Sequence, residues 1–387
     1  MARLGDLCDI LNGYAFKSEQ YVDSGIRIIR IANVQKGYIE DSTPVFYPVN
    51  NNEYKKYELY EGDLLISLTG NVGRVALLQK EFLPAALNQR VACLRIKDES
   101  VLNQSFLFSM LDSDYFENKC IESSKGVAQK NMSTEWLKEY DIHLFSMEEQ
   151  LRISNELDTI NNLISLRKQQ LAKLDELVKS RFIEMFGNVR DNEKNWEKVS
   201  LKSVAEVRGR VGWKGYKKDD LRESGPLVLG ATHLTESGCL DLSSPVHLSR
   251  EKYEESPEIM LQKNDLIFTQ RGNTIGKVGL LENDIGEATI NPCVLILRPL
   301  TINPIYFKTY FILDETKSDM WSLNAGSAQP MITQKGIGDY MLMLPPMEVQ
   351  KQFAAFVEQT DKSKFEIQQS LEKLETLKKA LMQKYFG

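Results

Sequence analysis

The chain has 387 residues, of which 42% are hydrophobic and 9% aromatic, so it can form the cores of two or three domains. Its net charge of −6 excludes the usual proteins that coat nucleic acid without sequence preference, which are basic. The five cysteines form no Cys-x-x-Cys pair, and no apolar run reaches the length of a signal-peptide core or a membrane span. We therefore expect a soluble, cytoplasmic protein with reduced thiols and no membrane contact.

Residues 1–147 predict a globular domain that mixes strands and helices. Short apolar stretches bounded by turn residues predict its strands: residues 25–34, 64–68, 74–78, 91–96 and 142–144. Residues 104–119 have helical spacing, and residues 4–10 fit either a short helix or a strand. Between two of the strands, Thr69-Gly70-Asn71-Val72-Gly73 predicts a tight loop followed by Arg74.

Residues 148–187 predict one long helix. No Pro or Gly interrupts it before Gly187, which stands where a left-handed helix cap is expected. Its apolar positions alternate in steps of four and three: Ile153, Leu157, Ile160, Ile164, Leu171, Leu174 and Val178, with Arg167 filling the remaining seam position. This heptad spacing predicts that the helix packs along a partner helix.

The second half of the chain repeats the first. Met147, Glu148, Gln150 and Phe186-Gly187 recur 200 residues later as Met347, Glu348, Gln350 and Phe386-Gly387. Residues 188–346 replay the order of strands and loops, with a matching strand at 264–268, a glycine loop at 269–277 and a helix at 306–316. Such an internal duplication predicts two copies of one architecture.

The predicted fold is α+β with a pseudo-twofold internal repeat. Two mixed α/β domains, at residues 1–147 and 188–346, are separated by two long helices, at residues 148–187 and 347–387. The helices are expected to bury their apolar stripes on each other as an antiparallel coiled coil. The second stripe is more polar, with Thr360, Lys364 and Lys378 at seam positions.

The sequence contains no convincing pattern for catalysis or for a metal. Residues 272–277 fall one residue short of a phosphate-binding loop, and Val278 follows where Ser or Thr would be needed. The three histidines form no His-x-x-x-His pair, and Glu53-Tyr54-Lys55 is too common a triplet to indicate a nuclease. We predict no catalytic residue, no metal site and no cofactor bound by this chain.

Polar and basic residues favour binding to double-stranded DNA instead. Residues 197–222 carry an excess of Lys and Arg interleaved with Trp213 and Tyr216, although a solvated loop would have the same composition. The two glycine loops carry Arg, Asn and Lys, which suit guanine and adenine edges but can also merely cap a hairpin. The candidates for DNA contact are Arg30, Asn33, Thr69, Asn71, Arg74, Arg90, Gln129, Arg208, Arg210, Lys214, His233, Thr269, Arg271, Asn273, Lys277 and Gln329. The candidates for partner binding and the helix seam are Leu157, Ile160, Ile164, Leu171, Leu174, Ile367, Leu371 and Leu374.

These features together resemble the specificity subunit of type I restriction-modification systems over the whole chain. Residues 265–279 are similar to the most recognisable internal motif of that family, and residues 63–75 are a looser copy. Trp196-Glu197-Lys198-Val199-Ser200-Leu201 resembles the usual opening of a target-recognition domain, whereas the first domain lacks that opening Trp. The Met-Glu-x-Gln starts and Phe-Gly ends of the long helices resemble the two spacer regions of the family.

The resemblance implies that residues 1–147 and 188–346 are target-recognition domains, each reading one half of a bipartite DNA site. The long helices would act as a ruler, each about 55 Å long at ~1.5 Å per residue, and would dock two methyltransferase subunits. Those partners bring S-adenosylmethionine and the catalysis, so this chain is expected not to be an enzyme; restriction motor-nuclease subunits can join the complex.

Two other functions are compatible with parts of the sequence. A homodimeric coiled-coil adaptor for other proteins would use the same long helices, but it would not need the Arg/Lys-Gly-Asn loops twice. A fused modification enzyme or nuclease would need a cofactor motif that the sequence does not contain.

Overall fold

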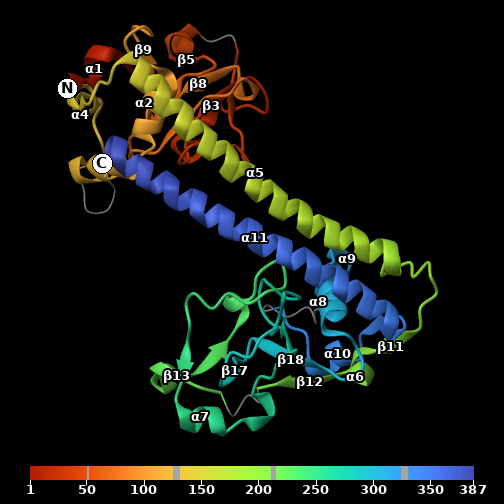
Figure 1. The fold of residues 1–387 in the computed structure, drawn as a ribbon. Coiled ribbons are helices and arrows are strands. Elements are labelled where there is room, and N and C mark those ends of the chain that lie inside the picture. Colours follow the sequence, from red (N-terminus) through yellow and green to blue (C-terminus); the bar gives the residue numbers. More distant parts are fainter. Residues whose placement is uncertain (50–51, 125–130, 211–214, 324–329) are drawn as a thin grey trace. The chain divides into compact units, whose positions relative to one another are not determined.

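The computed structural model describes residues 1–49, 52–124, 131–210, 215–323 and 330–387 (Figure 1). The chain forms two compact units: unit 1 comprises residues 1–167 and 370–387, and unit 2 comprises residues 168–369. Each unit therefore holds one globular domain together with parts of both long helices. Among the described residues, no helix combines the length and the apolar character that a bilayer crossing requires.

The described residues of unit 1 form two four-stranded sheets and one two-stranded pair. The first sheet has the antiparallel order β2 (Cys8–Asn12), β9 (Val91–Ile96), β6 (Leu64–Ser67) and β7 (Val75–Leu77). The second has the order β4 (Phe46–Tyr47), β3 (Ile26–Ile29), β8 (Ala85–Leu87) and β5 (Glu58–Leu59), in which β3 and β8 are parallel. β1 (Ala2–Arg3) pairs with β10 (Asp141–Ile142). The short helices are α1 (Leu4–Leu7), α2 (Gln104–Leu111), α3 (Asp114–Ser123) and α4 (Thr134–Glu139).

Unit 2 repeats this topology. Its antiparallel sheet has the order β12 (Ala205–Gly209), β18 (Val294–Pro299), β15 (Leu266–Thr269) and β16 (Val278–Leu280). Its second sheet has the order β14 (His247–Leu248), β13 (Leu221–Leu229) and β17 (Ala288–Ile290), again with one parallel pair, and β11 (Lys198–Ser200) pairs with β19 (Met341–Met343). The short helices are α6 (Leu201–Val204), α7 (Arg250–Glu254), α8 (Pro304–Ile312), α9 (Asp314–Ser322) and α10 (Gln334–Gly338). The predicted duplication of the fold is confirmed.

Both predicted long helices are present and uninterrupted: α5 (Met147–Phe186) and α11 (Met347–Phe386). Gly187 adopts the expected left-handed conformation after α5, with φ 81°. In unit 1 the Tyr385 hydroxyl near the end of α11 donates to Glu156 near the start of α5, at 2.7 Å. In unit 2 Lys364 of α11 pairs with Asp175 of α5, also at 2.7 Å. In each unit the later part of one helix therefore meets the earlier part of the other, as an antiparallel pair does.

The Met-Glu-x-Gln start of each long helix fixes the helix to its domain. The buried side chain of Gln150 accepts a hydrogen bond from the Asn103 amide and donates to the carbonyl oxygens of Val101 and Phe145. Gln350 accepts from the Asn303 amide and donates to Pro345 in the same way. Because a buried amide without these partners is costly, this glutamine specifies the position of the helix start.

The predicted seam positions are buried to different degrees. Leu157 and Ile160 belong to the core of unit 1, with Ile164 packed against it, and Leu371 is 6% exposed. Leu171, Leu174, Ile367 and Leu374 are half-buried. These positions line the inner face of the helices, and their role in binding a partner stays a prediction.

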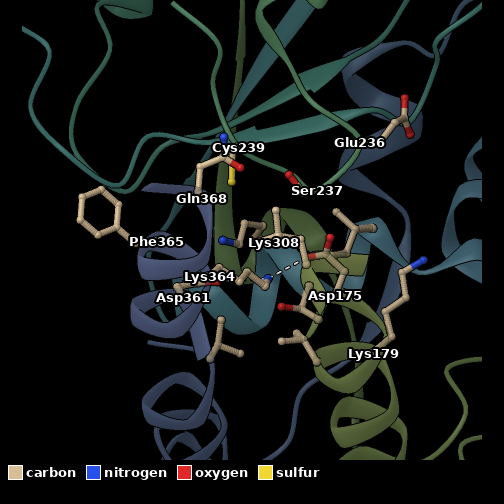
Figure 2. A pocket seen from close by; sticks show the side chains of 15 residues that line it. Asp175, Lys179, Glu236, Ser237, Cys239, Lys308, Asp361, Lys364, Phe365 and Gln368 are labelled. Atoms are coloured by element: carbon tan, nitrogen blue, oxygen red, sulfur yellow. Dashed lines mark ion pairs between the residues drawn. The ribbon is translucent and has the colours of Figure 1, made fainter. Parts of the chain in front are cut away.

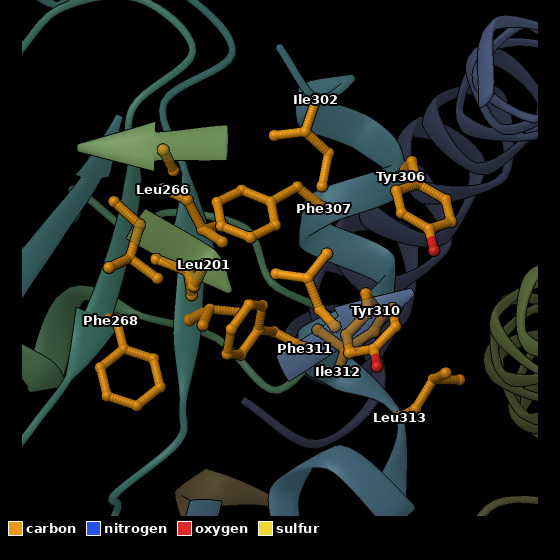
Figure 3. Close-up of a cluster of buried hydrophobic side chains, with 14 of the residues drawn as sticks. Leu201, Leu266, Phe268, Ile302, Tyr306, Phe307, Tyr310, Phe311, Ile312 and Leu313 are labelled. Carbon is orange, nitrogen blue, oxygen red and sulfur yellow. The ribbon is translucent and has the colours of Figure 1, made fainter. Parts of the chain in front are cut away.

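The core of unit 2 joins its sheet to both long helices. Figure 3 shows Tyr306, Phe307, Tyr310 and Phe311 of α8 gathered with strand residues such as Leu266 in a single apolar cluster. On the helix side Tyr306 stacks on Phe182, with ring centroids 5.3 Å apart. Aromatic residues of this size contribute much of the stability of a core, so α8 fixes the domain to the helix pair.

Several predicted elements differ in extent from the structure; the predicted strand 142–144, for example, is the shorter β10 (Asp141–Ile142). The predicted helix 104–119 is two helices, because Ser113 caps a new one by accepting from the Phe116 amide. The predicted helix 306–316 is likewise α8 and α9, which meet at Leu313. The predicted strand 25–34 ends at Ile29 and continues as a 3₁₀ turn, Ile31–Asn33, and residues 4–10 contain both a helix and a strand.

One ion pair is repeated with its charges exchanged. In unit 1 Lys36 pairs with Glu117 at 2.7 Å and with Asp114 at 2.5 Å. In unit 2 the residues 200 positions after Lys36 and Glu117 have the opposite signs, and Lys317 pairs with Glu236 at 3.2 Å. The two units thus make the same contact, between the loop after a 3₁₀ turn and a short helix, with reversed polarity.

Asp112 in unit 1 occupies a position at which unit 2 has the buried Ile312. One of its carboxylate oxygens is buried without a hydrogen-bond partner among the described residues. Burial raises the pKa of Asp112 from 3.8 to about 6; Lys378 and Lys36 oppose this rise, and Glu117 and Asp114 add to it. The charged carboxylate is therefore a destabilising group in the folded chain.

Asp112→Asn is expected to make unit 1 more stable at pH 7–8, by about 1–2 kcal/mol after allowance for partial solvent screening. Since the folded state binds more protons than the unfolded state between pH 3.8 and about 6, the parent loses stability as pH rises through that window. The variant should not lose stability over this pH range. The difference in unfolding free energy between the variant and the parent should therefore vanish near pH 3.8. Urea unfolding across this pH range measures it.

Asp114→Asn is the matched control with the opposite sign. Its hydrogen bond to Lys36 lowers the pKa of Asp114, so this carboxylate stabilises the folded chain above its unfolded pKa and loses that effect as pH falls. The control variant should be slightly less stable than the parent at pH 7. If Asp112→Asn lowered stability at pH 7 as Asp114→Asn does, the assignment of the Asp112 carboxylate as a destabilising group would be contradicted.

Candidate nucleic-acid interface

The glycine loop of unit 1 follows β6 and is shaped by its own hydrogen bonds. The Ser67 hydroxyl donates to the Asn71 carbonyl oxygen and accepts from the Arg74 amide, which closes the loop. Gly70 and Gly73 have φ values of 71° and 83°, which other residues rarely adopt. The loop therefore turns tightly and leaves the Asn71 side chain exposed.

Four predicted contact residues of unit 1 line one hollow. Thr69, Asn71, Arg74 and Arg90 surround a space of about 270 Å³ together with residues of the 3₁₀ turn after β3. Arg74 donates from Nη1 to the Gln35 side chain at 2.6 Å, which holds its guanidinium at the edge of the hollow. The hollow thus presents hydroxyl, amide and guanidinium groups, the types that bind base edges and phosphates.

The loop of unit 2 after β15 is built in the same way. Gly272 and Gly276 have φ values of 96° and 86°, and the side chains of Arg271 and Asn273 are exposed. Arg271 donates from Nη2 to the Met331 sulfur at 3.1 Å. Its guanidinium therefore lies beside the chain that leads into α10.

Lys277 in unit 2 is held much as Arg74 is in unit 1. It pairs with Glu236 at 3.3 Å. Glu236 lies on the loop of unit 2 that corresponds to the loop carrying Gln35 in unit 1. Lys317 and then Lys277 lower the pKa of Glu236, so this carboxylate stays charged. A phosphate that bound Lys277 would have to compete with that carboxylate.

The strand pairings establish which residues correspond in the two loops. Bridges join Thr69 to Asn131 in unit 1 and Arg271 to Met331 in unit 2, so Arg271 takes the place of Thr69. Thr269 instead matches Ser67 as the last residue of its strand. Its side chain is fully buried, with a hydroxyl that has no hydrogen-bond partner among the described residues. A direct contact with DNA would require this residue to become exposed.

Asn33 and His233 occupy equivalent positions inside the two domains. Each is buried at the end of a 3₁₀ turn and accepts a hydrogen bond from the backbone three residues earlier, Arg30 N and Gly230 N respectively. Asn33 also donates to Glu40 and Asp41. Both side chains stabilise the turn, and Asn33, whose amide oxygen and nitrogen are both engaged, could contact a base only by giving up such a bond.

The remaining basic candidates have internal partners as well. Arg30 donates to the Thr43 carbonyl oxygen, and Arg208 on β12 pairs with Glu206 and donates to Glu258 O. Arg210 is 6% exposed, donates to Ile290 O at 3.0 Å and lies over the Tyr216 ring. Burial lowers the pKa of Arg210. The basic residues of the stretch 197–222 thus lie on several different elements.

Three candidates, Gln129, Lys214 and Gln329, lie outside the described residues, as does Trp213. Their DNA contacts stay predictions. Among the residues that the structure describes, no group of three or more His, Cys, Asp or Glu side chains is placed to hold a metal ion.

The long helices carry exposed apolar residues away from the seam, which the heptad pattern missed. In unit 1 Leu163, Leu166 and Leu377 are 40–53% exposed. In unit 2 Phe365 is 64% exposed at a hollow of about 520 Å³ between α5, α8 and α11. Figure 2 shows Lys364 directed at Asp175 in this hollow, with Cys239 and Ser237 on the loop across from it. Apolar residues outside the heptad positions are the signal that could have identified this outer face.

Known proteins are similar to this chain in sequence. The chain is 29% identical over 184 residues to the type I restriction enzyme MjaVIII specificity subunit of Methanocaldococcus jannaschii, which covers 46% of this chain and 43% of the relative. It is 35% identical over 163 residues to the EcoAI specificity subunit of Escherichia coli, covering 41% and 27%. With the EcoBI specificity subunit of the same species it shares 21% identity over 99% of this chain and 84% of the relative. The aligned segments thus span less than half of the first two relatives.

The fold is also similar to solved structures. A type I restriction-modification S subunit from M. genitalium superposes with a TM-score of 0.57 at 16% identity, covering 100% of this chain and 95% of the other. A chain from a structure of the type I R-M system gives a TM-score of 0.59 at 18% identity. The model of the type I restriction modification DNA specificity domain matches twice, at residues 1–176 and 193–379. With two such domains in one duplicated fold, this chain belongs to the DNA specificity family of type I restriction-modification systems.

Proposed function

We propose that this chain is the DNA-recognition subunit of a type I restriction-modification complex and reads two half-sites, one with each domain. The observation that carries the proposal is the repeated glycine loop. It stands at the same place in the same sheet of both units but presents Thr69, Asn71 and Arg74 in one, and Arg271, Asn273 and Lys277 in the other. Equal scaffolds with unequal side chains suit an asymmetric, bipartite DNA site.

The remaining members of the complex follow from the same proposal. The outer faces of the long helices, with Leu166 and Phe365 exposed, would dock two methyltransferase subunits, and motor-nuclease subunits would complete the restriction complex. S-adenosylmethionine and catalysis reside in the partners, and the complex acts in the cytoplasm. Since this chain has a net charge of −6, the partners would share the neutralisation of the DNA phosphates.

Mapping methylated bases in DNA from cells that carry this chain and its methyltransferase partner tests the proposal. We expect one bipartite sequence with a fixed spacer, absent from cells that lack this chain. Methylation by this chain alone would contradict the assignment of catalysis to a partner. A stable self-dimer that ignores the methyltransferase in size measurements would favour the adaptor instead.

Arg271→Ala and Arg74→Ala should each weaken binding to the cognate DNA site. If the side chain contacts a base edge, the loss is about 1–3 kcal/mol and specificity relaxes at one position of the corresponding half-site. If it contacts a phosphate, all sequences lose affinity alike and the salt dependence falls by about one unit. Fluorescence anisotropy of the assembled complex at several salt concentrations separates these results.

The matched controls are Lys138→Ala in unit 1 and Lys263→Ala in unit 2, which remove exposed charges away from the loops. They should leave affinity for the site nearly unchanged. Unchanged affinity and specificity in the loop variants themselves would remove these arginines from the DNA-reading surface.

A further inference from the structure

Gln35 in unit 1 lies beside the glycine loop, although the sequence did not single it out. Its side chain lines the hollow of about 270 Å³ together with Thr69, Asn71 and Arg74. Its amide oxygen accepts from Nη1 of Arg74 at 2.6 Å, and its amide nitrogen donates to the Ala32 carbonyl oxygen at 2.8 Å. Because a guanidinium only donates and a carbonyl oxygen only accepts, these two partners fix the orientation of the amide group.

The backbone that carries Gln35 is joined to the strand beside Arg74. The Gln35 amide donates to the Tyr38 carbonyl oxygen at 3.0 Å, and the Gly37 amide donates to the Val75 carbonyl oxygen at 2.9 Å. Val75 is the first residue of β7 and directly follows Arg74. The backbone therefore sets the distance between the Gln35 and Arg74 side chains, in addition to their own hydrogen bond.

The hydrogen bond to Gln35 leaves one edge of the Arg74 guanidinium available. Among the described residues, Nε and Nη2 of Arg74 have no hydrogen-bond partner. The N–H groups on this edge form a planar fork, which matches two neighbouring acceptors such as O6 and N7 of guanine. The described residues that line the hollow include no Asp or Glu, so no carboxylate there competes for the fork.

One wall of the hollow is apolar. It is formed by Ile31, Ala32 and Val34, of which Val34 is buried and Ile31 half-buried. A phosphate group beside such a wall would lose solvation without gaining a partner. The major-groove edge of the bases combines acceptor atoms with carbon and methyl groups, so it suits both the apolar wall and the guanidinium.

The equivalent cation in unit 2 has a charged partner instead. Lys277 pairs there with the Glu236 carboxylate at 3.3 Å. A carboxylate offsets the charge of the cation that it holds, whereas the neutral amide of Gln35 orients Arg74 and leaves its positive charge intact. The pairing in unit 1 thus favours contact with an electron-rich group of the DNA.

We infer that Gln35 is a positioning residue that presents the Nε–Nη2 edge of Arg74 to a guanine in the half-site read by unit 1. It acts through Arg74, because a guanidinium that is already oriented does not have to be immobilised when DNA binds. This inference rests on the proposed function and adds to it a base and the residue that orients the side chain reading that base.

The first test uses the assembled complex with its methyltransferase partners and the DNA site found by methylation mapping. The half-site of unit 1 is the half that an exchange of residues 196–340 leaves unchanged. Each guanine in it, on either strand, is replaced in turn by 7-deazaguanine, which lacks the N7 acceptor. One replacement should weaken binding by roughly tenfold, because a hydrogen bond from a charged donor is lost, and Arg74→Ala should abolish this sensitivity.

The outcomes of this test separate the inference from the proposed function. If the complex binds one bipartite sequence but no guanine in this half-site is sensitive, the inference is overturned and the proposed function stands. Arg74 would then contact a phosphate. A complex without any preferred sequence would refute the proposed function itself.

The second test is Gln35→Met, which removes both polar groups of the amide at nearly the same length. Affinity for the cognate site should fall by about 2- to 12-fold, the cost of ordering one long side chain, with little change on other DNA. In a chain that already carries Arg74→Ala, the same substitution should have no further effect. Equal losses with and without Arg74 would mean that Gln35 acts on the fold alone and would overturn its positioning role.

Gln79→Met is the matched control, because Gln79 is an exposed glutamine of unit 1 that does not line the hollow. It should leave both affinity and the sensitivity to 7-deazaguanine unchanged. Urea unfolding verifies that each variant is folded, and the 7-deazaguanine series on the parent complex needs no variant. A loss for Gln79→Met equal to that for Gln35→Met would contradict the specific role of Gln35.

Discussion

Phe353→Ala is expected to lower the free energy of unfolding of unit 2 by about 3–5 kcal/mol, the usual cost of removing a buried aromatic ring. Phe353 lies on α11 and is fully buried. Its ring lies 5.5 Å from Phe182 and 5.4 Å from Phe186, both on α5, with edge-to-face geometry. The truncation would therefore leave a cavity where the two helices and α8 meet.

Phe365→Ala on the same helix is the matched control, because its side chain is 64% exposed. It should change stability by no more than about 0.5 kcal/mol. Urea unfolding followed by tryptophan fluorescence reports mainly on unit 2, since Trp136 alone of the four tryptophans belongs to unit 1. Equal effects of the two substitutions would mean that Phe353 is not packed between the helices in solution.

Replacing residues 196–340 with the corresponding domain of another family member is expected to change one half of the methylated DNA sequence completely and to leave the other half intact. The reason is that each unit folds around apolar clusters of its own. Unit 1 has its own sheets and apolar cluster, and none of its strands pairs with a strand of unit 2 among the described residues. The exchange should therefore not disturb the loop that carries Asn71 and Arg74.

The donor domain must satisfy one packing requirement. Tyr306 lies within the exchanged stretch and stacks on Phe182, and its hydroxyl donates to the Met343 carbonyl oxygen at 2.8 Å. A donor with an aromatic residue at this position keeps the domain attached to the helices. Sequencing of methylated sites in cells that carry the exchanged chain gives the result, with the parent chain as the reference. Changes in both half-sites would refute independent reading.

The sequence predicted the parts of the fold that depend on periodicity and on duplication. The heptad spacing of Leu157 and Ile160 was sufficient for α5, and the 200-residue recurrence of Gln150 as Gln350 predicted a second copy of the helix start. These patterns are local or strictly repeated, so they can be recognised in the sequence without knowledge of tertiary contacts. The break between α2 and α3 was missed although Ser113 before Asp114 is a recognisable helix start.

The candidate site was predicted less completely, for a different physical reason. Exposed loop residues such as Asn71 and Arg271 were identified because glycines beside them indicate a tight loop. The polar character of a residue, however, does not reveal whether its partner is solvent, DNA or the chain itself. Asn33 and His233 are polar because they cap a buried turn. Thr269 is the last residue of its strand and is fully buried, which its residue type alone did not reveal.

The exchanged ion pair has a consequence for how such a gene can recombine. A crossover that brought the loop of one repeat together with the short helix of the other would place Lys36 against Lys317, or Glu236 against Glu117. Either chimaera would confront two like charges at a contact that both parents satisfy. Viable hybrids between the repeats should therefore inherit this loop and this helix from the same parent, which makes each domain a unit of inheritance as well as of folding.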